Sequence, residues 1–128
     1  MPTTPAELCG RIFSVIEATQ DAALGELNRG VSAMYAATST NPSLVLPRLI
    51  NRRMAHHRKL LRDKGGLAVT LDSRLAELFH QVNEMGGVPG ALSSVGQSQF
   101  ALGYFAERRD RFTKRTGEPP SDTQEEMQ

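Results

Sequence analysis

Four basic residues fall on one line if the segment that holds them is a helix. They are Arg48, Arg52, Lys59 and Arg62. At about 100° per residue their side chains lie within roughly 80° of arc and extend along about 20 Å of helix. We expect no acidic residue on this face, so these cations would be unpaired. A row of unpaired cations favours a polyanion, and nucleic acid above all, as its partner.

Basic residues are concentrated in two stretches, although the formal net charge of the chain is only +1. Seven of the 15 Lys and Arg residues lie between residues 48 and 64, and five lie between residues 108 and 115. The first stretch adds Arg53 and Arg58 to the four residues above, and the second supplies Arg108, Arg111, Lys114 and Arg115. The planar guanidinium of Arg suits phosphate oxygens. Both stretches are therefore predicted to contact a nucleic-acid backbone, with a solvated helix face as the alternative.

Aromatic residues accompany the second basic stretch. On a helix, Phe100 and Tyr104 share one side with Arg108 and Arg111. The other side, which we expect to face the core, carries Ala101, Leu102, Phe105 and Phe112. Basic and aromatic side chains together suit a single-stranded or hybrid nucleic acid, through phosphate pairing and base stacking. Packing inside the protein is the commoner role of such aromatic residues and remains the alternative.

The remaining reactive residues form no catalytic or metal-binding pattern. His56 and His57 are adjacent, so on a helix they would point about 100° apart and could not chelate one metal ion. Cys9 is the only cysteine, which excludes an intramolecular disulfide and a Cys-based zinc site. We therefore expect no enzymatic activity, no metal and no cofactor. A single free cysteine fits a protein of the reducing cytoplasm.

Helical patterns separated by glycine and proline fill most of the chain. The expected helices cover about residues 5–27, 31–38, 43–64, 67–85 and 95–114. Gly65 and Gly66 are expected to end the basic helix, and Pro47 to start it or kink its first turn. No segment alternates in the manner of a strand. The prediction is an all-α fold, a helical bundle of four main helices plus one short helix.

The bundle is expected to occupy residues 1–115 as one domain. Residues 116–128 are polar, contain two prolines and four acids, and are predicted to form a disordered acidic tail. The N-terminal residues lack the basic and apolar regions of a signal peptide. No apolar stretch approaches the roughly 18 residues needed to cross a membrane, so no membrane contact is expected.

Three segments carry a distinctive combination of residues. Residues 100–105 read Phe-Ala-Leu-Gly-Tyr-Phe and are followed by Arg108 and by Phe-Thr-Lys at 112–114. Residues 10–17 read Gly-Arg-Ile-Phe-Ser-Val-Ile-Glu, with Gln20 after them, and residues 47–49 read Pro-Arg-Leu. In order and spacing, this set resembles the C-terminal helical domain of the large subunit of the type I-C CRISPR Cascade complex. The similarity spans about residues 6–115.

The resemblance implies a role in antiviral defence. In such systems this domain is also made separately, from an internal start, as the small subunit of Cascade. Met1 would then be that start, and a piece cut from the large subunit is the alternative. The implied function is a non-catalytic subunit of an RNA-guided DNA surveillance complex that stabilises the R-loop. Its partners would be the guide RNA, the target DNA, the displaced non-target strand, the backbone and large subunits, and a second copy of itself.

Two other functions remain open. A free-standing helical DNA-binding regulator would also need a basic helix, but this helix has few Asn, Gln or Ser side chains for base edges. A helical protein-interaction module could instead direct its cations towards acidic protein surfaces. Sequence-specific DNA binding would identify the regulator, and the lack of any nucleic-acid binding would identify the interaction module.

Overall fold

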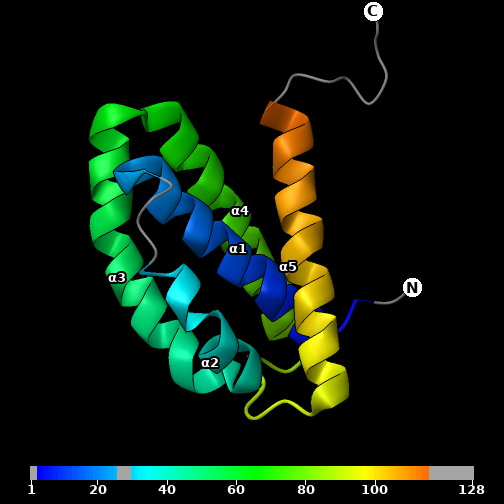
Figure 1. The fold of residues 1–128 in the computed structure, drawn as a ribbon. Coiled ribbons are helices and arrows are strands. Elements are labelled where there is room, and N and C mark those ends of the chain that lie inside the picture. Colours follow the sequence, from blue (N-terminus) through cyan, green and yellow to red (C-terminus); the bar gives the residue numbers. More distant parts are fainter. Residues whose placement is uncertain (1–2, 26–29, 116–128) are drawn as a thin grey trace, which may run out of the picture.

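The computed structural model describes residues 3–25 and 30–115, and the side chains as far as residue 113. It contains α1 (Pro5–Leu24), a 3-10 turn (Ser32–Met34), α2 (Tyr35–Thr40), α3 (Pro42–Asp63), α4 (Gly65–Glu84) and α5 (Ser94–Arg115). The described residues include no strand, so the predicted all-α bundle is confirmed (Figure 1). The predicted acidic tail lies outside the described residues. None of the described helices is long and apolar enough to cross a membrane.

The ends of α1 follow from local chemistry. Thr4 caps the helix, because its hydroxyl accepts a 3.2 Å hydrogen bond from the backbone N–H of Glu7, and Pro5 suits the first turn. The helix ends at Leu24, because Gly25 has a φ of 96°, which glycine adopts readily. The prediction that this helix continues to residue 27 is therefore wrong, and residues 26–29 lie outside the described part.

The hairpin between α3 and α4 turns at a single residue. Lys64 is not helical, with a φ of −147° and a ψ of 71°, and its N–H donates to the Leu60 carbonyl oxygen at 2.6 Å. Gly65 and Gly66 are the first residues of α4, so the prediction that they end the basic helix is wrong. Pro47 lies inside α3, because the helix already begins at Pro42. Its ring removes one hydrogen bond from the first turns without stopping the helix.

The helix α1 is the centre of the bundle and packs against α3, α4 and α5 (Figure 1). Its side chains supply much of the core, including the fully buried Leu8, Ile12, Phe13, Val15 and Ile16. Four aromatic rings, from Phe13, Tyr35, Phe100 and Tyr104, meet between α1, α2 and α5 with centroids 5.0–6.0 Å apart. These edge-on and tilted contacts add to the stabilisation from burial.

The backbones of α1 and α5 touch at two glycines. A Cβ atom on Gly10 would overlap the carbonyl oxygen of Phe100 and lie 2.8 Å from the backbone nitrogen of Tyr104. A Cβ atom on Gly103 would overlap the carbonyl oxygen of Glu7. Backbone atoms cannot move aside as a flexible side chain can. Any residue with a side chain would therefore force the two helices apart.

Replacing either of these glycines with alanine is expected to destabilise the protein by about 3 kcal/mol, as overpacking does, despite alanine's higher helix propensity. Gly66→Ala is the matched control. It lies within α4, and a Cβ atom there would have nothing within 4 Å. Urea unfolding followed by circular dichroism measures all three variants. Equal stability of Gly103→Ala and Gly66→Ala would contradict the close contact.

Candidate nucleic-acid interface

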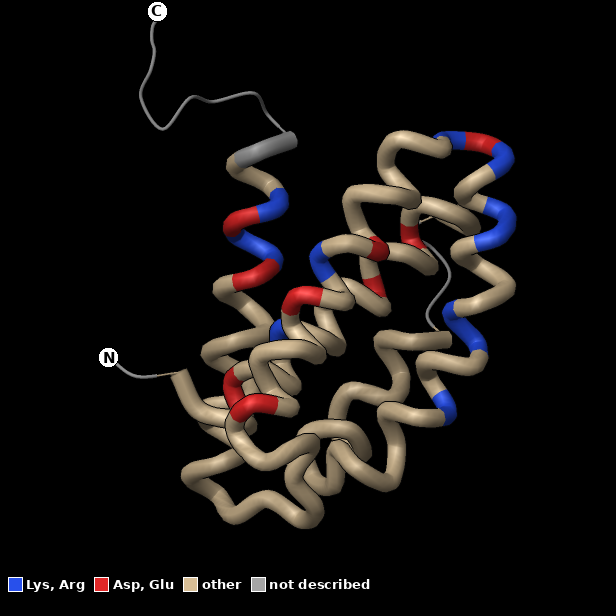
Figure 2. The backbone as a smooth tube through the Cα atoms, turned by 180° about the vertical axis from the view of Figure 1, so that it is seen from behind, with Lys and Arg blue, Asp and Glu red and all other residues tan. Residues whose placement is uncertain are grey.

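The outer face of α3 carries an exposed row of arginines. Arg48, Arg52, Arg58 and Arg62 are all exposed, and we call these four residues the arginine ridge. Within the described residues, no hydrogen bond or ion pair engages any of the four side chains. Figure 2 shows Lys and Arg recurring along the outer edge of α3. The opposite side of the helix is buried, through Val45, Leu46, Leu49 and Leu60, so the core fixes the direction in which the ridge points.

Lys59 differs from the ridge because it is paired. Its ammonium group donates a 2.6 Å hydrogen bond to Asp63, one turn further along α3. This hydrogen bond is the main reason why the pKa of Asp63 is lowered. The expectation that this face carries no acidic residue is therefore wrong, because Asp63 lies on it, four residues after Lys59. Both side chains are about half exposed, so the pair contributes little stability.

Arg53 is a structural residue rather than a surface one. It is 5% exposed, and its guanidinium donates to the Thr19 hydroxyl and to Asp72, both at 3.1 Å. It therefore joins α3 to α1 and α4, and its predicted contact with nucleic acid is not compatible with this position. At about 100° per residue, Arg53 lies roughly 140° around the helix from Arg48, which already places it on the apolar side.

The two faces of α5 are the reverse of those expected. Phe100 and Tyr104 are buried in the aromatic cluster, whereas Leu102, Phe105 and Phe112 are exposed. Tyr104 donates a 2.7 Å hydrogen bond to the buried carboxylate of Glu17. Burial, with this hydrogen bond, raises the pKa of Tyr104 to about 12. Neither ring is therefore available to stack on a base, and the predicted core side of α5 is its outer side.

Two of the basic residues of α5, Arg108 and Arg111, lie against the protein. Arg108 donates to the Tyr104 hydroxyl at 2.9 Å, lies 3.8 Å from Glu17, and stacks over the rings of Tyr104 and Phe112. Burial lowers the pKa of Arg111, which is only partly exposed. Lys114 and Arg115 belong to α5, but their side chains lie outside the described part. The side chains of Arg108 and Arg111 are thus less accessible to a polyanion than those of the ridge.

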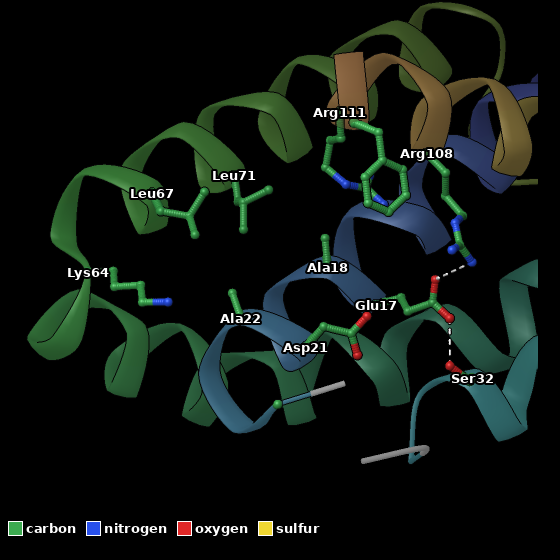
Figure 3. Close-up of a pocket in the computed structure, with 12 residues that line it drawn as sticks. Glu17, Ala18, Asp21, Ala22, Ser32, Lys64, Leu67, Leu71, Arg108 and Arg111 are labelled. Carbon is green, nitrogen blue, oxygen red and sulfur yellow. Dashed lines mark hydrogen bonds and ion pairs between the residues drawn. The ribbon is translucent and has the colours of Figure 1, made fainter. Parts of the chain in front are cut away.

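A pocket of about 580 Å³ lies between α1, α4 and α5 (Figure 3). Its lining residues are Glu17, Ala18, Asp21, Ala22, Gly25, Ser32, Lys64, Leu67, Leu71, Arg108, Arg111 and Phe112. One terminal nitrogen of Arg111 is buried there without a hydrogen-bond partner in the described structure. The lining mixes cations, carboxylates and aliphatic groups, so its charge does not select one class of ligand. The ridge, by contrast, presents one sign of charge.

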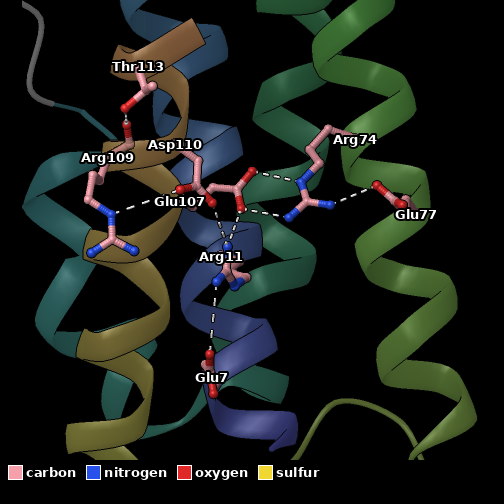
Figure 4. Close-up of polar contacts among 8 residues, drawn as sticks. All are labelled: Glu7, Arg11, Arg74, Glu77, Glu107, Arg109, Asp110 and Thr113. Carbon is pink, nitrogen blue, oxygen red and sulfur yellow. Dashed lines mark hydrogen bonds and ion pairs between the residues drawn. The ribbon is translucent and has the colours of Figure 1, made fainter. Parts of the chain in front are cut away.

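A buried carboxylate also holds three helices together (Figure 4). Glu107 on α5 accepts hydrogen bonds of 2.8 and 2.9 Å from Arg74 on α4, and one of 2.9 Å from Arg11 on α1. Burial disfavours its charge, but the hydrogen bonds from Arg74 and Arg11 prevail, and the pKa of Glu107 is lowered. The sequence does not reveal this cluster, because Arg74 and Arg11 lie 33 and 96 residues from Glu107.

The other reactive side chains form no site in the described part of the chain. No three His, Cys, Asp or Glu residues converge there in a way that could hold a metal ion. Cys9 is fully buried, and burial raises its pKa to about 12. The pKa of His56 is lowered by partial burial and by Arg52.

The chain matches a known protein family over most of its length. The model of a family of CRISPR-associated proteins, Cas_Csd1, matches residues 2–112. The matched residues include the complete arginine ridge and both glycines of the α1–α5 contact. Lys114, Arg115 and the acidic tail lie beyond the match. No curated protein matches the chain.

Glu107→Gln is expected to destabilise the fold by about 3 kcal/mol at pH 7, because two arginines lose their buried partner. Since the pKa of Glu107 is lower in the folded chain, its stabilising effect is present above the unfolded value, near 4.5, and disappears as pH falls through the folded value. As pH falls below about 4.5, the free energy of unfolding should therefore decrease less in the variant than in the parent protein.

Urea unfolding at several pH values tests this expectation. Glu77→Gln is the control, because Glu77 pairs with the same Arg74 at 2.7 Å but its side chain is 58% exposed. An exposed pair contributes less than about 1 kcal/mol. Similar losses at pH 7 from Glu107→Gln and Glu77→Gln would show that the buried cluster does not hold the helices together.

Proposed function

Because this chain belongs to the CRISPR-associated Cas_Csd1 family, we propose that it is the small subunit of a type I-C Cascade complex. In this role it is non-catalytic and acts in the cytoplasm, beside the backbone and large subunits of the complex. It stabilises the R-loop by contacting the backbones of the guide–target hybrid and of the displaced DNA strand. The guide RNA reads the sequence, so the subunit needs no contacts with base edges.

The observation that carries this proposal is the arginine ridge. Its four guanidinium groups extend along about 20 Å of α3, at 1.5 Å rise per residue. This length is enough to follow several successive phosphates of one nucleic-acid strand. The ridge residues have no acidic partner in the described structure, so no internal ion pair has to break when phosphates bind. Lys59 can join them by leaving its exposed pair with Asp63.

Weak, unspecific contacts of this kind suit the energetics of R-loop formation. Exchanging the DNA duplex for an RNA–DNA hybrid is nearly balanced in free energy, so a few phosphate contacts can decide the outcome. Other subunits supply further contacts with the same nucleic acids, and the resulting avidity reduces the affinity that one ridge must provide. The isolated chain is therefore expected to bind nucleic acid weakly.

Changing the four ridge residues together to glutamine should leave the fold intact, because all four side chains are exposed. It should weaken binding of target DNA by the assembled complex. It should also reduce the slope of log K against log salt, by about 0.7 to 0.9 for each phosphate that the variant no longer neutralises. Equilibrium binding at several salt concentrations measures both effects.

Two single variants provide controls for this experiment. Arg109→Gln removes a similarly exposed cation from α5 and should leave the affinity and the salt slope unchanged. The matching ridge variant, Arg52→Gln, should reduce both. Arg53→Gln should lower the stability of the protein without a specific effect on the slope, because Arg53 is buried. If the fourfold variant binds with unchanged affinity and slope, the ridge has no part in binding.

A further inference from the structure

One cation in the pocket between α1, α4 and α5 lacks a partner. A terminal nitrogen of Arg111 is buried there, and the side chain makes no hydrogen bond or ion pair within the described residues. Burial disfavours its charge and lowers its pKa, although the carboxylates of Glu107 and Glu17 favour the charge. Buried donors normally have an acceptor, so this guanidinium is placed to receive one from outside the chain.

Formal charge does not select a ligand for this pocket, but the hydrogen bonds that its lining already makes do. Both oxygens of Glu17 are engaged, one by the Tyr104 hydroxyl at 2.7 Å and one by the Ser32 hydroxyl at 2.6 Å. Arg108 lies 3.8 Å from Glu17. The pKa of Arg108 is raised, first by its hydrogen bond to Tyr104 and further by nearby charges, including those of Glu17 and Asp21. The hydrogen-bonding capacity that remains therefore belongs to donors.

Lys64 supplies a second such donor. It is exposed, lies at the turn between α3 and α4, and makes no hydrogen bond or ion pair in the described part of the chain. Figure 3 shows its side chain directed into the pocket, as is that of Arg111 from α5. The flexible stem of Lys64 allows its ammonium group to follow a bound anion. Two such cations match a phosphate monoester, with a charge of about −1.5 to −2 near pH 7, better than a single carboxylate.

Aliphatic side chains form the walls of the pocket. Leu67 and Leu71 belong to α4, Ala18 and Ala22 belong to α1, and all four line the pocket. The volume of about 580 Å³ lies within the range of small-molecule sites, which is about 300–1,000 Å³. A ligand with an uncharged body can therefore contact the aliphatic walls while its anionic group reaches the cations.

We propose that the pocket binds a small phosphate monoester with a largely uncharged body, of which a nucleoside monophosphate is the example to test. The phosphate accepts hydrogen bonds from Arg111, whose planar guanidinium suits its oxygens, and Lys64 adds a second contact. The body packs against the leucines and alanines. A free nucleotide and the terminal nucleotide of a strand carry the same group. The inference does not depend on the arginine ridge, because no ridge residue lines the pocket.

Titration of the isotope-labelled full chain with dAMP, followed by NMR, tests the site. Backbone signals of lining residues, such as Leu67 and Leu71, should shift. Arg111→Gln should weaken binding by about 10- to 100-fold, as the loss of a hydrogen bond to a charged group does. Arg109→Gln is the matched control on α5, with a side chain that is 76% exposed in the parent, and should bind like the parent. Equal binding by the parent and by Arg111→Gln would overturn the proposal.

The fourfold ridge variant separates this inference from the proposed function. It should bind dAMP as the parent does, whatever its effect on target DNA. A loss of dAMP binding in this variant would place the nucleotide on the ridge and overturn the pocket site.

Ligand comparisons test the two parts of the site. Adenosine and inorganic phosphate should each bind more weakly than dAMP. Equal affinity for adenosine would overturn the phosphate contact, and equal affinity for inorganic phosphate would overturn the contact with the walls. A 5′-phosphorylated oligodeoxyadenylate that displaces dAMP identifies a strand end as the source, and one that does not identifies a free nucleotide. Displacement by the same oligonucleotide without its terminal phosphate would overturn the preference for a monoester.

Stability measurements distinguish a ligand site from a structural role. Because Arg111 has no internal partner, Arg111→Gln should not lower the urea midpoint when dAMP is absent. A clear decrease would assign this arginine to the support of the bundle and overturn the proposal. Leu67→Glu is an independent variant at a position that is 38% exposed. It adds a carboxylate to the lining and should abolish dAMP binding by repulsion.

Discussion

The contact of α1 and α5 at Gly10 and Gly103 is the constraint on which the rest of the structure depends. With no Cβ atom between them, the two backbones approach closely enough for Phe100 and Tyr104 to enter the core beside Phe13. The same approach allows Tyr104 to donate a hydrogen bond to the carboxylate of Glu17, and Glu107 to accept one from the guanidinium of Arg11. The orientation of α5, including its outward apolar face, follows from this one contact.

Carboxylates on neighbouring helices then decide which cations remain available. Glu107 engages Arg11 and Arg74, Glu17 lies beside Arg108, and Asp72 engages Arg53. These arginines therefore support the bundle, although the sequence alone presents several of them as surface charge. The outer face of α3 has no such carboxylate except Asp63, which pairs with Lys59. The four ridge arginines are among the cations that this internal pairing leaves for an external polyanion, and they form a row on one helix face.

The sequence predicts some of these features and not others, for physical reasons. Helical periodicity is strong in α3, so its buried side and the exposure of Arg48, Arg52 and Arg62 on the other side are correctly predicted, whereas the pairing of Lys59 with Asp63 is not. The two sides of α5 are both apolar in part, so periodicity cannot choose between them. Gly103, on the side of Phe100, was the available signal, because it lies where α5 touches the backbone of α1. Two of the three motifs that resemble the CRISPR family contain Gly10, Phe13, Gly103 and Tyr104, so these two report the α1–α5 contact. The third motif, at residues 47–49, contains the ridge residue Arg48.

The most direct test is to assemble the RNA-guided complex with and without this chain and to measure its affinity for target DNA at moderate salt. If the account is correct, the chain co-purifies with the complex, and its omission weakens target binding. The contrary result is a complex that excludes the chain and binds equally well without it. Sequence-specific binding of duplex DNA by the isolated chain would then identify a regulator instead.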